Sequence, residues 1–203
     1  MSLTAAGAVA LAVVLEAAVG EPPARIHPVA WFGRAVAPFD REWAHPLAVG
    51  ALVALVLPLV AASVVAGVVA LAGRVDTLAA AGVAGVALFA TTSLRMLSRE
   101  ARAVVAATES DLAAARERLP SLAGRDAGEL SAGEIRSAAV ESAAENLADG
   151  LVAPLLAFAL GALVSLPVAA GAAAWVKAVN TLDSMLGYRA KRVGTPSARL
   201  DDA

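Results

Sequence analysis

Long apolar stretches separated by short polar segments dominate the first half of this chain. Residues 3–19 are apolar except for Glu16, and about 17 such residues suffice for a short membrane span. The stretches 46–73 and 77–94 are also apolar, and only the turn at 73–76 between them is polar. The pattern predicts membrane-spanning helices over these three stretches. The lack of a basic start favours a retained helix over a signal peptide at 3–19.

The region that follows the third span is rich in charged side chains and predicts a helical excursion from the membrane. We expect one helix over 95–119, a loop at 124–126 and a second helix from about Ala132. Ser131 and Glu134 have the spacing of a capping box, in which each side chain bonds the backbone N–H of the other residue at a helix start.

The last apolar stretch, 151–188, is interrupted near Ser165 and Pro167. Its first arm, 151–164, is short for a full crossing of the bilayer, whereas its second arm, 168–188, has about the required length. We therefore expect a broken helical hairpin, either re-entrant or tilted. Its irregular tip must be buried in protein, because lipid cannot satisfy free backbone groups.

Composition supports the same architecture. Hydrophobic residues make up 59% of the chain and charged residues 17%, with a mean hydropathy of +0.72, whereas soluble proteins have roughly 25% charged residues. The fold class predicted is all-α: a polytopic integral membrane protein with a single membrane domain over 1–203. The lack of cysteine excludes disulfides and thiolate catalysis. A net charge of −2 gives no support for binding to nucleic acid.

Basic residues predict how the helices are oriented. The polar loop 20–45 carries three arginines and the charged region 95–149 carries seven, whereas the turn at 73–76 carries only Arg74. Because arginine and lysine accumulate in cytoplasmic loops, both large loops are predicted to be cytoplasmic. We therefore expect a multi-pass protein of the cell (cytoplasmic) membrane with its functional loops on the cytoplasmic face.

Three carboxylates precede the last apolar stretch at a helical spacing. Glu141, Glu145 and Asp149 stand at positions i, i+4 and i+8, so a helix would place them on one face. Such a stripe can hold a divalent cation together with the phosphates that the cation carries. The alternative is a solvated end of an amphipathic helix.

A polar face is also predicted within the second arm of the hairpin. Lys177, Asn180, Thr181 and Ser184 are spaced as i, i+3, i+4 and i+7, and Asp183 is nearby. An ionisable residue at membrane depth is costly and suggests a functional site. The alternatives are polar contacts between helices and a lysine that reaches to the interface.

The prolines of loop 20–45 predict an extended path that carries Glu21, Arg25 and His27 past the membrane surface. His27 could act as a base, contact a phosphate or cap a helix, and its spacing does not choose among these roles. The alternative for the whole segment is an interfacial linker anchored by Trp31.

Several motifs occur along the chain in a fixed order: Gly20-Glu-Pro-Pro-x-Arg-x-His-Pro-Val29, Thr92-Ser-Leu-Arg95, Gly124-Arg-Asp126, Val140-Glu-Ser-x-Ala-Glu-Asn-x-x-Asp-Gly150, Asn180-Thr-Leu-Asp-Ser-Met-x-Gly-Tyr-Arg189 and Ala198-Arg-Leu-Asp-Asp202. Together they resemble the cobalamin-biosynthesis membrane proteins of the CobD/CbiB family, which are adenosylcobinamide-phosphate synthases. Related chains continue beyond the last motif, so we expect the C-terminal part of such a protein to be absent from this sequence.

The resemblance implies an amide-forming ligase of vitamin B12 synthesis. Such an enzyme joins adenosylcobyric acid to aminopropanol phosphate or ethanolamine phosphate, uses ATP and Mg²⁺, and yields adenosylcobinamide phosphate. The implied partners are the corrinoid, the amino-alcohol phosphate and the lipid bilayer. Further partners compatible with the resemblance are a second copy of the chain and other enzymes of the pathway. Two other classes stay open: a non-catalytic scaffold or corrinoid-binding relative, and a small transporter.

The resemblance also implies roles for individual residues. It implies that Mg²⁺ is held by Glu141, Glu145 and Asp149. On this basis we hypothesise catalytic roles for His27, Glu141, Glu145 and Asp183, with His27 or Asp183 accepting the proton of the amine. The resemblance implies substrate contacts for Glu21, Arg25, Arg95, Arg125, Asp126, Asn146, Lys177, Asn180, Ser184, Tyr188, Arg189 and Arg199.

Overall fold

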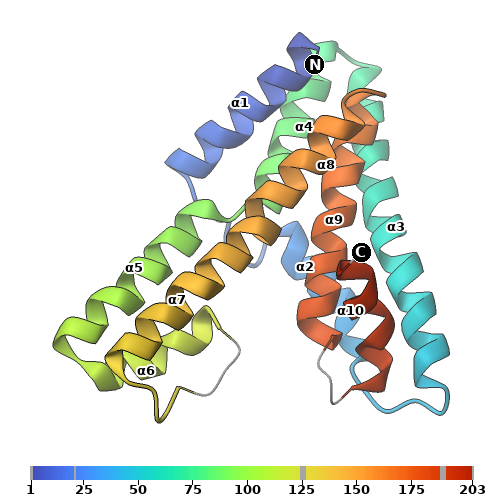
Figure 1. Cartoon of the computed structure of the whole chain (residues 1–203). Coiled ribbons are helices and arrows are strands. Elements are labelled where there is room, and N and C mark those ends of the chain that lie inside the picture. Colours follow the sequence, from blue (N-terminus) through green and yellow to red (C-terminus); the bar gives the residue numbers. More distant parts are fainter. Residues whose placement is uncertain (1, 21, 124–126, 188–190, 203) are drawn as a thin grey trace. The chain divides into compact units, whose positions relative to one another are not determined.

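The computed structural model describes residues 2–20, 22–123, 127–187 and 191–202, and these residues form helices and no strand (Figure 1). The chain divides into two compact units. Unit 1 consists of Met1–Thr92 and Ala153–Ala203, and unit 2 consists of Ser93–Val152. Unit 2 coincides closely with the charged region that the sequence analysis separates from the apolar stretches.

Unit 1 contains the apolar helices and the short segments that join them. Its helices are α1 (Leu3–Ala18), α2 (Pro28–Val36), η1 (Ala37–Phe39), α3 (Pro46–Gly73), α4 (Thr77–Thr91), α8 (Ala153–Gly161), α9 (Leu166–Leu186), η4 (Arg192–Gly194) and α10 (Thr195–Asp201). Helices are confirmed at the positions predicted over 3–19, 46–73 and 77–94, but α1 is too short to count among the candidate membrane spans. The third ends at Thr91 because Thr92 is extended and its hydroxyl donates a hydrogen bond back to the Phe89 carbonyl at 2.9 Å.

In the described part of the chain, three helical stretches are long and apolar enough to cross a membrane: Pro46–Gly73, Thr77–Ser110 and Ala132–Gly161. The first two contain predicted spans. The third stretch differs from the prediction. The sequence pattern places its first part in the charged region that ends at residue 149 and its second part in a hairpin arm that begins at residue 151. The helical backbone continues there through a π-helical turn over Ala148–Val152 (η3), which absorbs an extra residue without ending the helix.

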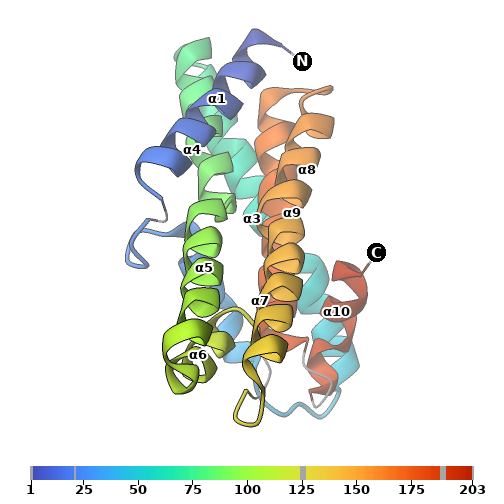
Figure 2. The same ribbon diagram turned by 60° about the vertical axis from the view of Figure 1, so that its left-hand side comes forward.

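The predicted broken hairpin is confirmed. Helices α8 and α9 lie side by side and are joined by a short turn (Figures 1 and 2). The Ser165 hydroxyl accepts the Val168 N–H at 3.3 Å and caps the start of α9. The first arm is shorter than predicted, because the turn begins after Gly161. A Cβ on Gly161 would lie 2.7 Å from the Ala169 Cα, so glycine allows the two helices to approach this closely.

Small residues also set the packing of α1 against α4 (Figure 2). Ala5, Ala8 and Ala12 form the buried stripe of α1 and belong to the main apolar core of unit 1. A Cβ on Gly85 of α4 would lie 2.8 Å from the Ala8 carbonyl oxygen. Close backbone approach at small residues is a common way for membrane helices to associate without relying on hydrophobic exclusion from water.

Unit 2 consists of α5 (Leu94–Ser110), α6 (Leu112–Arg118), η2 (Leu119–Ser121), α7 (Ala132–Leu147) and η3. The prediction of one helix over 95–119 is wrong, because the helix breaks at Asp111. The Asp111 backbone is extended and its carboxylate accepts the Ala114 N–H at 3.1 Å, which caps α6. The core between these helices includes Val104, Leu119 and Ile135, each fully buried. The predicted loop at 124–126 lies outside the described residues.

The predicted capping box at the start of α7 is confirmed. The Ser131 hydroxyl accepts the Glu134 N–H at 3.4 Å, and the Glu134 carboxylate accepts the Ser131 N–H at 2.8 Å. Both side chains are exposed, so water competes with these bonds. The box therefore determines where α7 begins and makes a modest contribution to stability.

Replacing Ser131 with alanine is expected to lower the free energy of unfolding by about 1 kcal/mol, because the Glu134 N–H at the start of α7 loses its acceptor. Thermal unfolding of the purified chain measures the effect. Ser137→Ala is the matched control, since Ser137 is an exposed serine within the same helix. An equal loss in both variants would contradict a capping role.

Candidate functional site

Lys177 lines a cavity of about 130 Å³ in unit 1. The cavity is partly open and is lined by four helices, and apart from Lys177 its lining is apolar or carries a threonine hydroxyl. The lining residues are Pro28, Val29 and Phe32 of α2, Ala61 and Val65 of α3, Ala87, Ala90 and Thr91 of α4, and Ala174, Lys177, Ala178 and Thr181 of α9. Lys177 is the ionisable residue of this lining, whose accessible surface is almost entirely apolar.

Two threonine hydroxyls of the lining are oriented by the backbone. The Thr181 hydroxyl donates to the Lys177 carbonyl oxygen at 2.7 Å, and the Thr91 hydroxyl donates to the Leu88 carbonyl oxygen at 2.7 Å. A hydroxyl that donates its proton to a carbonyl keeps its lone pairs as acceptors. These two threonines therefore offer acceptor oxygens, whereas the lysine ammonium offers donors and a positive charge.

The other predicted residues of α9 lie one to two turns beyond Lys177. Asn180 and Asp183 are partly buried, and the exposed Ser184 hydroxyl donates to the Asn180 carbonyl oxygen at 2.9 Å. A Cβ on Gly187 would coincide with the Asp183 carboxylate. Glycine at that position therefore leaves the space that the carboxylate occupies. The predicted contacts Tyr188 and Arg189 lie outside the described residues.

His27 caps helix α2. Its Nδ1 accepts the Val29 N–H at 3.2 Å, and the residue is only 7% exposed. A neutral imidazole that accepts at Nδ1 carries its proton on Nε2. Of the three roles left open by the sequence, the structure shows capping, and action as a base through Nδ1 would require the cap to break.

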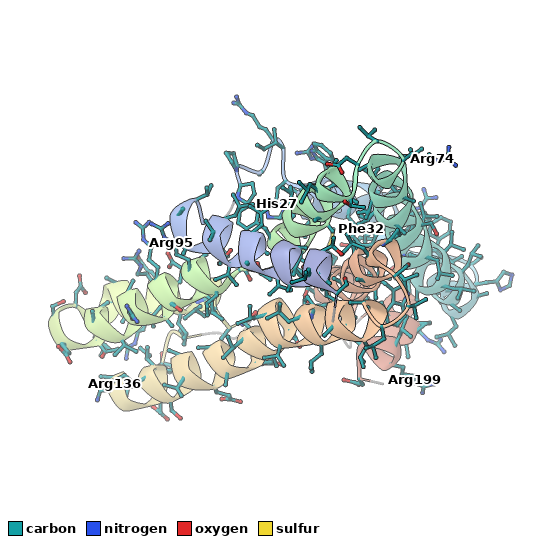
Figure 3. The ribbon with its side chains drawn as sticks, turned by 90° about the horizontal axis from the view of Figure 1, so that it is seen from above. His27, Phe32, Arg74, Arg95, Arg136 and Arg199 are labelled. Atoms are coloured by element: carbon teal, nitrogen blue, oxygen red, sulfur yellow. The ribbon has the colours of Figure 1, made fainter. Side chains whose placement is uncertain are left out.

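The segment before His27 is tied to α2 rather than extended over the whole loop. The Trp31 indole N–H donates to the Arg25 carbonyl oxygen at 2.9 Å, and Arg34 Nη2 donates to the Ala24 carbonyl oxygen at 3.1 Å. The prediction of an extended path is wrong for this segment, because residues 24–26 form a turn in which the Ile26 N–H donates to the Pro23 carbonyl oxygen at 3.0 Å. Helix α2 then begins at Pro28, since proline is well suited to the first position of a helix. Figure 3 shows His27 and Phe32 at this part of unit 1. The Arg25 side chain is exposed, and Glu21 lies outside the described residues.

The predicted acidic stripe belongs to unit 2. Glu141 and Glu145 are exposed on α7, whereas Asp149 lies in the π-helical turn and is partly buried. Among the described residues, no three histidine, aspartate or glutamate side chains are placed to hold a metal ion. The three-carboxylate metal site therefore stays a prediction.

Glu141 and Glu145 by themselves fit one common mode of magnesium binding. They are one turn apart on the same exposed helix face. Mg²⁺ usually keeps several waters and is bound by one or two carboxylates together with substrate phosphates, rather than by a complete cage of protein ligands. A pair of carboxylates on an accessible face meets that requirement when a bound substrate supplies the phosphate oxygens.

The π-helical turn beside this stripe packs against Ser93 at the start of unit 2. The Ser93 N–H donates to the Gly150 carbonyl oxygen at 3.1 Å. A Cβ on Gly150 would lie 2.7 Å from the Ser93 hydroxyl oxygen, so a larger residue would push the two segments apart. The glycine of the acidic motif therefore serves the packing of unit 2. π-helical turns often occur at functional sites.

Asn146 has a structural role in unit 2. Its Nδ2 donates to the Ser142 carbonyl oxygen at 2.8 Å and to the Leu122 carbonyl oxygen at 3.2 Å. These bonds hold the segment after α6 against α7. Arg95 is exposed near the start of α5, and Arg199 is exposed in the last turn of α10 in unit 1. Arg125 and Asp126 lie outside the described residues.

One cluster of polar residues was missed by the sequence analysis. Lys191 Nζ forms an ion pair with the Asp40 carboxylate at 2.8 Å, although the residues are 151 positions apart. A single sequence gives no signal for such a pair, because the contact depends on how α3, α9 and α10 pack.

The apolar helices of unit 1 and the three candidate spans define an all-helical membrane protein. Its ionisable residue Lys177 lines a cavity between those helices. Residues 9–203 match the family described as CobD/Cbib protein, and the chain belongs to this CobD/CbiB family. No solved structure matches the chain.

Relatives of the chain carry names from cobalamin biosynthesis. It is 36% identical over 201 residues to cobalamin biosynthesis protein CobD of Klebsiella pneumoniae, covering 93% of this chain and 60% of the relative. It is 39% identical over 208 residues to CobD of Mycobacterium tuberculosis, covering 98% and 62%. It is 37% identical over 203 residues to protein CbiB of Salmonella choleraesuis, covering 95% and 61%. The chain thus spans about three fifths of the length of these relatives.

Proposed function

We propose that this chain acts in cobalamin biosynthesis as part of a membrane-bound, ATP-dependent amide ligase. The reaction joins the carboxylate of adenosylcobyric acid to the amine of aminopropanol phosphate or ethanolamine phosphate and gives adenosylcobinamide phosphate. The observation that carries this proposal is the match of residues 9–203 to the CobD/CbiB family, whose members among the relatives are named for cobalamin biosynthesis. Lys177 in the lining of the unit 1 cavity is compatible with it, because ATP and the amino-alcohol phosphate carry phosphate groups.

The chemistry determines what the protein must supply. A carboxylate is a poor acyl donor at neutral pH, so ATP first converts it into a mixed anhydride, most simply an acyl phosphate. The amine then attacks the activated carbonyl carbon and displaces phosphate. Only the neutral amine has a lone pair for this attack, so a base must accept its proton. The protein therefore needs cations that hold phosphate and a group that accepts a proton.

Lys177 supplies a cation for phosphate in this proposal. Its ammonium lies beside a largely apolar cavity, where the attraction between opposite charges is stronger than in water. A fixed cation of this kind stabilises the charge that develops during phosphoryl and acyl transfer. Asn180, one turn further along α9, orients the substrate in the same proposal, and Arg189 provides a second phosphate contact.

Asp183 is the better candidate for the base. The Nδ1 lone pair of His27 is engaged by the Val29 N–H, whereas a carboxylate accepts protons at either oxygen. Asp183 is partly buried and lies six residues after Lys177 on α9.

Glu141 and Glu145, with Asp149, hold Mg²⁺ in this proposal. When bound, Mg²⁺ would neutralise part of the negative charge of the phosphate groups. The role of the two exposed glutamates of α7 is to present oxygen ligands on an accessible face. Their carboxylates also repel unliganded phosphate, which makes phosphate binding at this face dependent on the cation.

Conversion of adenosylcobyric acid tests the proposal directly. Chain 1–203 and a version extended to the length of its relatives are purified in detergent, supplied with ATP, Mg²⁺ and aminopropanol phosphate, and assayed for adenosylcobinamide phosphate by mass spectrometry. Product from both versions supports an active site within these residues. Product from the extended version alone supports the ligase activity and shows that the added sequence is necessary for it. No product from either folded version contradicts the proposal.

Replacing Glu145 with glutamine is expected to raise the Mg²⁺ concentration for half-maximal turnover by about tenfold or more, because an amide oxygen is a weaker ligand than a carboxylate. The measurement is turnover as a function of Mg²⁺ at saturating ATP. Glu117→Gln is the control, since Glu117 is an exposed glutamate of α6 in the same unit. An unchanged Mg²⁺ dependence in Glu145→Gln would remove this residue from the metal site.

A further inference from the structure

A second cavity of unit 1 lies at the N-terminal end of α3. Its volume is about 580 Å³, and it shares no lining residue with the Lys177 cavity. Its walls come from two segments that are distant in sequence, residues 40–46 before and at the start of α3, and residues 191–193 after α9. Neither the family match nor the proposed ligase chemistry assigns a role to this cavity.

The lining of this second cavity carries an excess of positive charge. Lys191 Nζ lies 2.8 Å from both carboxylate oxygens of Asp40, so this pair is neutral as a whole. No described carboxylate lies within ion-pair distance of Arg41 or Arg192. Glu42 is the remaining acidic residue of the lining. The cavity therefore presents two guanidinium groups against one carboxylate outside the Lys191–Asp40 pair.

Arg41 is held in place by aromatic side chains. Its guanidinium carbon lies 4.1 Å from the centroid of the Trp43 ring. The Trp43 indole N–H donates to the Phe39 carbonyl oxygen at 3.0 Å, and the two aromatic rings stack at 6.3 Å. A guanidinium stacked on an aromatic face keeps its N–H edge available for a planar, two-pronged contact with phosphate. Arg41 is therefore ordered before any ligand arrives.

The N-terminus of α3 adds a second feature that favours an anion. The helix is 28 residues long, its N-cap residue His45 makes no side-chain capping bond, and its first turn contains no acidic residue. The first turn of α3 itself therefore supplies no carboxylate to the positive end of the helix dipole or to its backbone N–H groups. Anions commonly bind at such termini.

Gly50 allows the segment that contains residues 191–193 to pack against the N-terminal end of α3. A Cβ on Gly50 would collide with the Val193 carbonyl oxygen and would lie 3.1 Å from the Pro196 Cδ. Glycine thus allows the backbone next to Arg192 to contact the first turns of α3. The two guanidinium groups and the helix terminus are thereby built into one cavity.

We propose that this cavity binds the phosphate group of a phospholipid headgroup. The cavity lies where a long apolar helix begins, and tryptophan and arginine are typical of the membrane interface at that level. A soluble phosphate such as that of ATP shares the same recognition chemistry. The proposal does not depend on the ligase reaction.

Binding of short-chain phospholipids to the detergent-purified chain tests this proposal. Dihexanoyl phosphatidylglycerol is titrated by calorimetry, with dihexanoyl phosphatidylcholine, ATP and inorganic phosphate as alternative ligands. We expect Arg41→Gln and Arg192→Gln each to weaken phosphatidylglycerol binding by about tenfold, since each removes a charge-assisted hydrogen bond. Asp40→Asn is expected to strengthen binding, because it frees the charge of Lys191.

Arg74→Gln is the matched control. Arg74 follows the C-terminal end of α3, at the opposite end of the same helix from the cavity. Lipid binding that ATP and phosphate do not displace supports the headgroup as the source, and tight binding of ATP or phosphate supports a soluble source of the same group. Equal affinity in the wild type and both cavity variants, or an equal loss in Arg74→Gln, overturns the proposal.

Discussion

Replacing Lys177 with methionine is expected to lower the turnover of the proposed ligation by about a hundredfold or more, because it removes the cation that lines the apolar cavity. Methionine keeps the length and the flexible apolar stem of lysine, so the packing of α9 is preserved. The measurement is the rate of formation of adenosylcobinamide phosphate, together with the thermal unfolding temperature in the same detergent. Turnover falls while the unfolding temperature stays close to that of the wild type.

The control for Lys177 removes a positive charge elsewhere in unit 1. Arg74→Met changes an exposed residue in the turn between α3 and α4, and we expect its turnover to equal that of the wild type. Lys177→Arg keeps the positive charge but enlarges the side chain, so it tests whether the size of the cation also matters in a cavity of about 130 Å³. Full activity in Lys177→Met would contradict the assignment. A loss that only accompanies unfolding would show that Lys177 is structural.

Replacing Gly50 with alanine is expected to lower the free energy of unfolding by about 1–3 kcal/mol, the usual cost of forcing an extra group into a packed interface. The new Cβ would collide with the Val193 carbonyl oxygen and lie 3.0 Å from the Val193 carbonyl carbon. A backbone carbonyl cannot move aside as the tip of a long side chain can. The segment 191–202 would therefore lose its close contact with α3, and thermal unfolding measures the loss.

Gly67→Ala is the matched control for Gly50→Ala. Both glycines lie within α3, but nothing lies within 4 Å of a Cβ on Gly67. Alanine there is expected to stabilise the helix by about 0.5–1 kcal/mol, because glycine loses more conformational entropy on folding. Limited proteolysis after residue 187 reports separately on the docking of segment 191–202. Similar stability in the two variants would contradict the role of close approach at Gly50.

Helix positions were largely predictable because hydropathy and local signals agree. The helix over Pro46–Gly73 has the predicted bounds, since a proline can begin a helix and a glycine can end one. The start of α7 and the break near Ser165 were also predicted, because serine hydroxyls cap helices through contacts within three residues. Such signals involve neighbouring positions, so one sequence contains all the information that they need.

Other local features were missed because two tendencies compete. Asp111 interrupts a helical pattern, and aspartate at the N-cap of α6 gains a hydrogen bond that a helix interior would not provide. Helix α2 begins directly after His27, where the prolines suggested a longer extended segment. The π-helical turn at Ala148–Val152 depends on the contact of Gly150 with Ser93, more than fifty residues away. No helical spacing in the sequence reports such a contact.

The sequence by itself determined the all-helical class, the positions of the apolar helices and the placement of Lys177, Asn180 and Asp183 on one helix. These features follow from composition and from a period of 3.6 residues. Only the tertiary structure decided which groups those side chains meet. It closes a cavity around Lys177 with helices from distant parts of the chain, and it pairs Lys191 with Asp40 across 151 positions. Such contacts depend on the packing of small residues between helices, which periodicity along the chain does not encode.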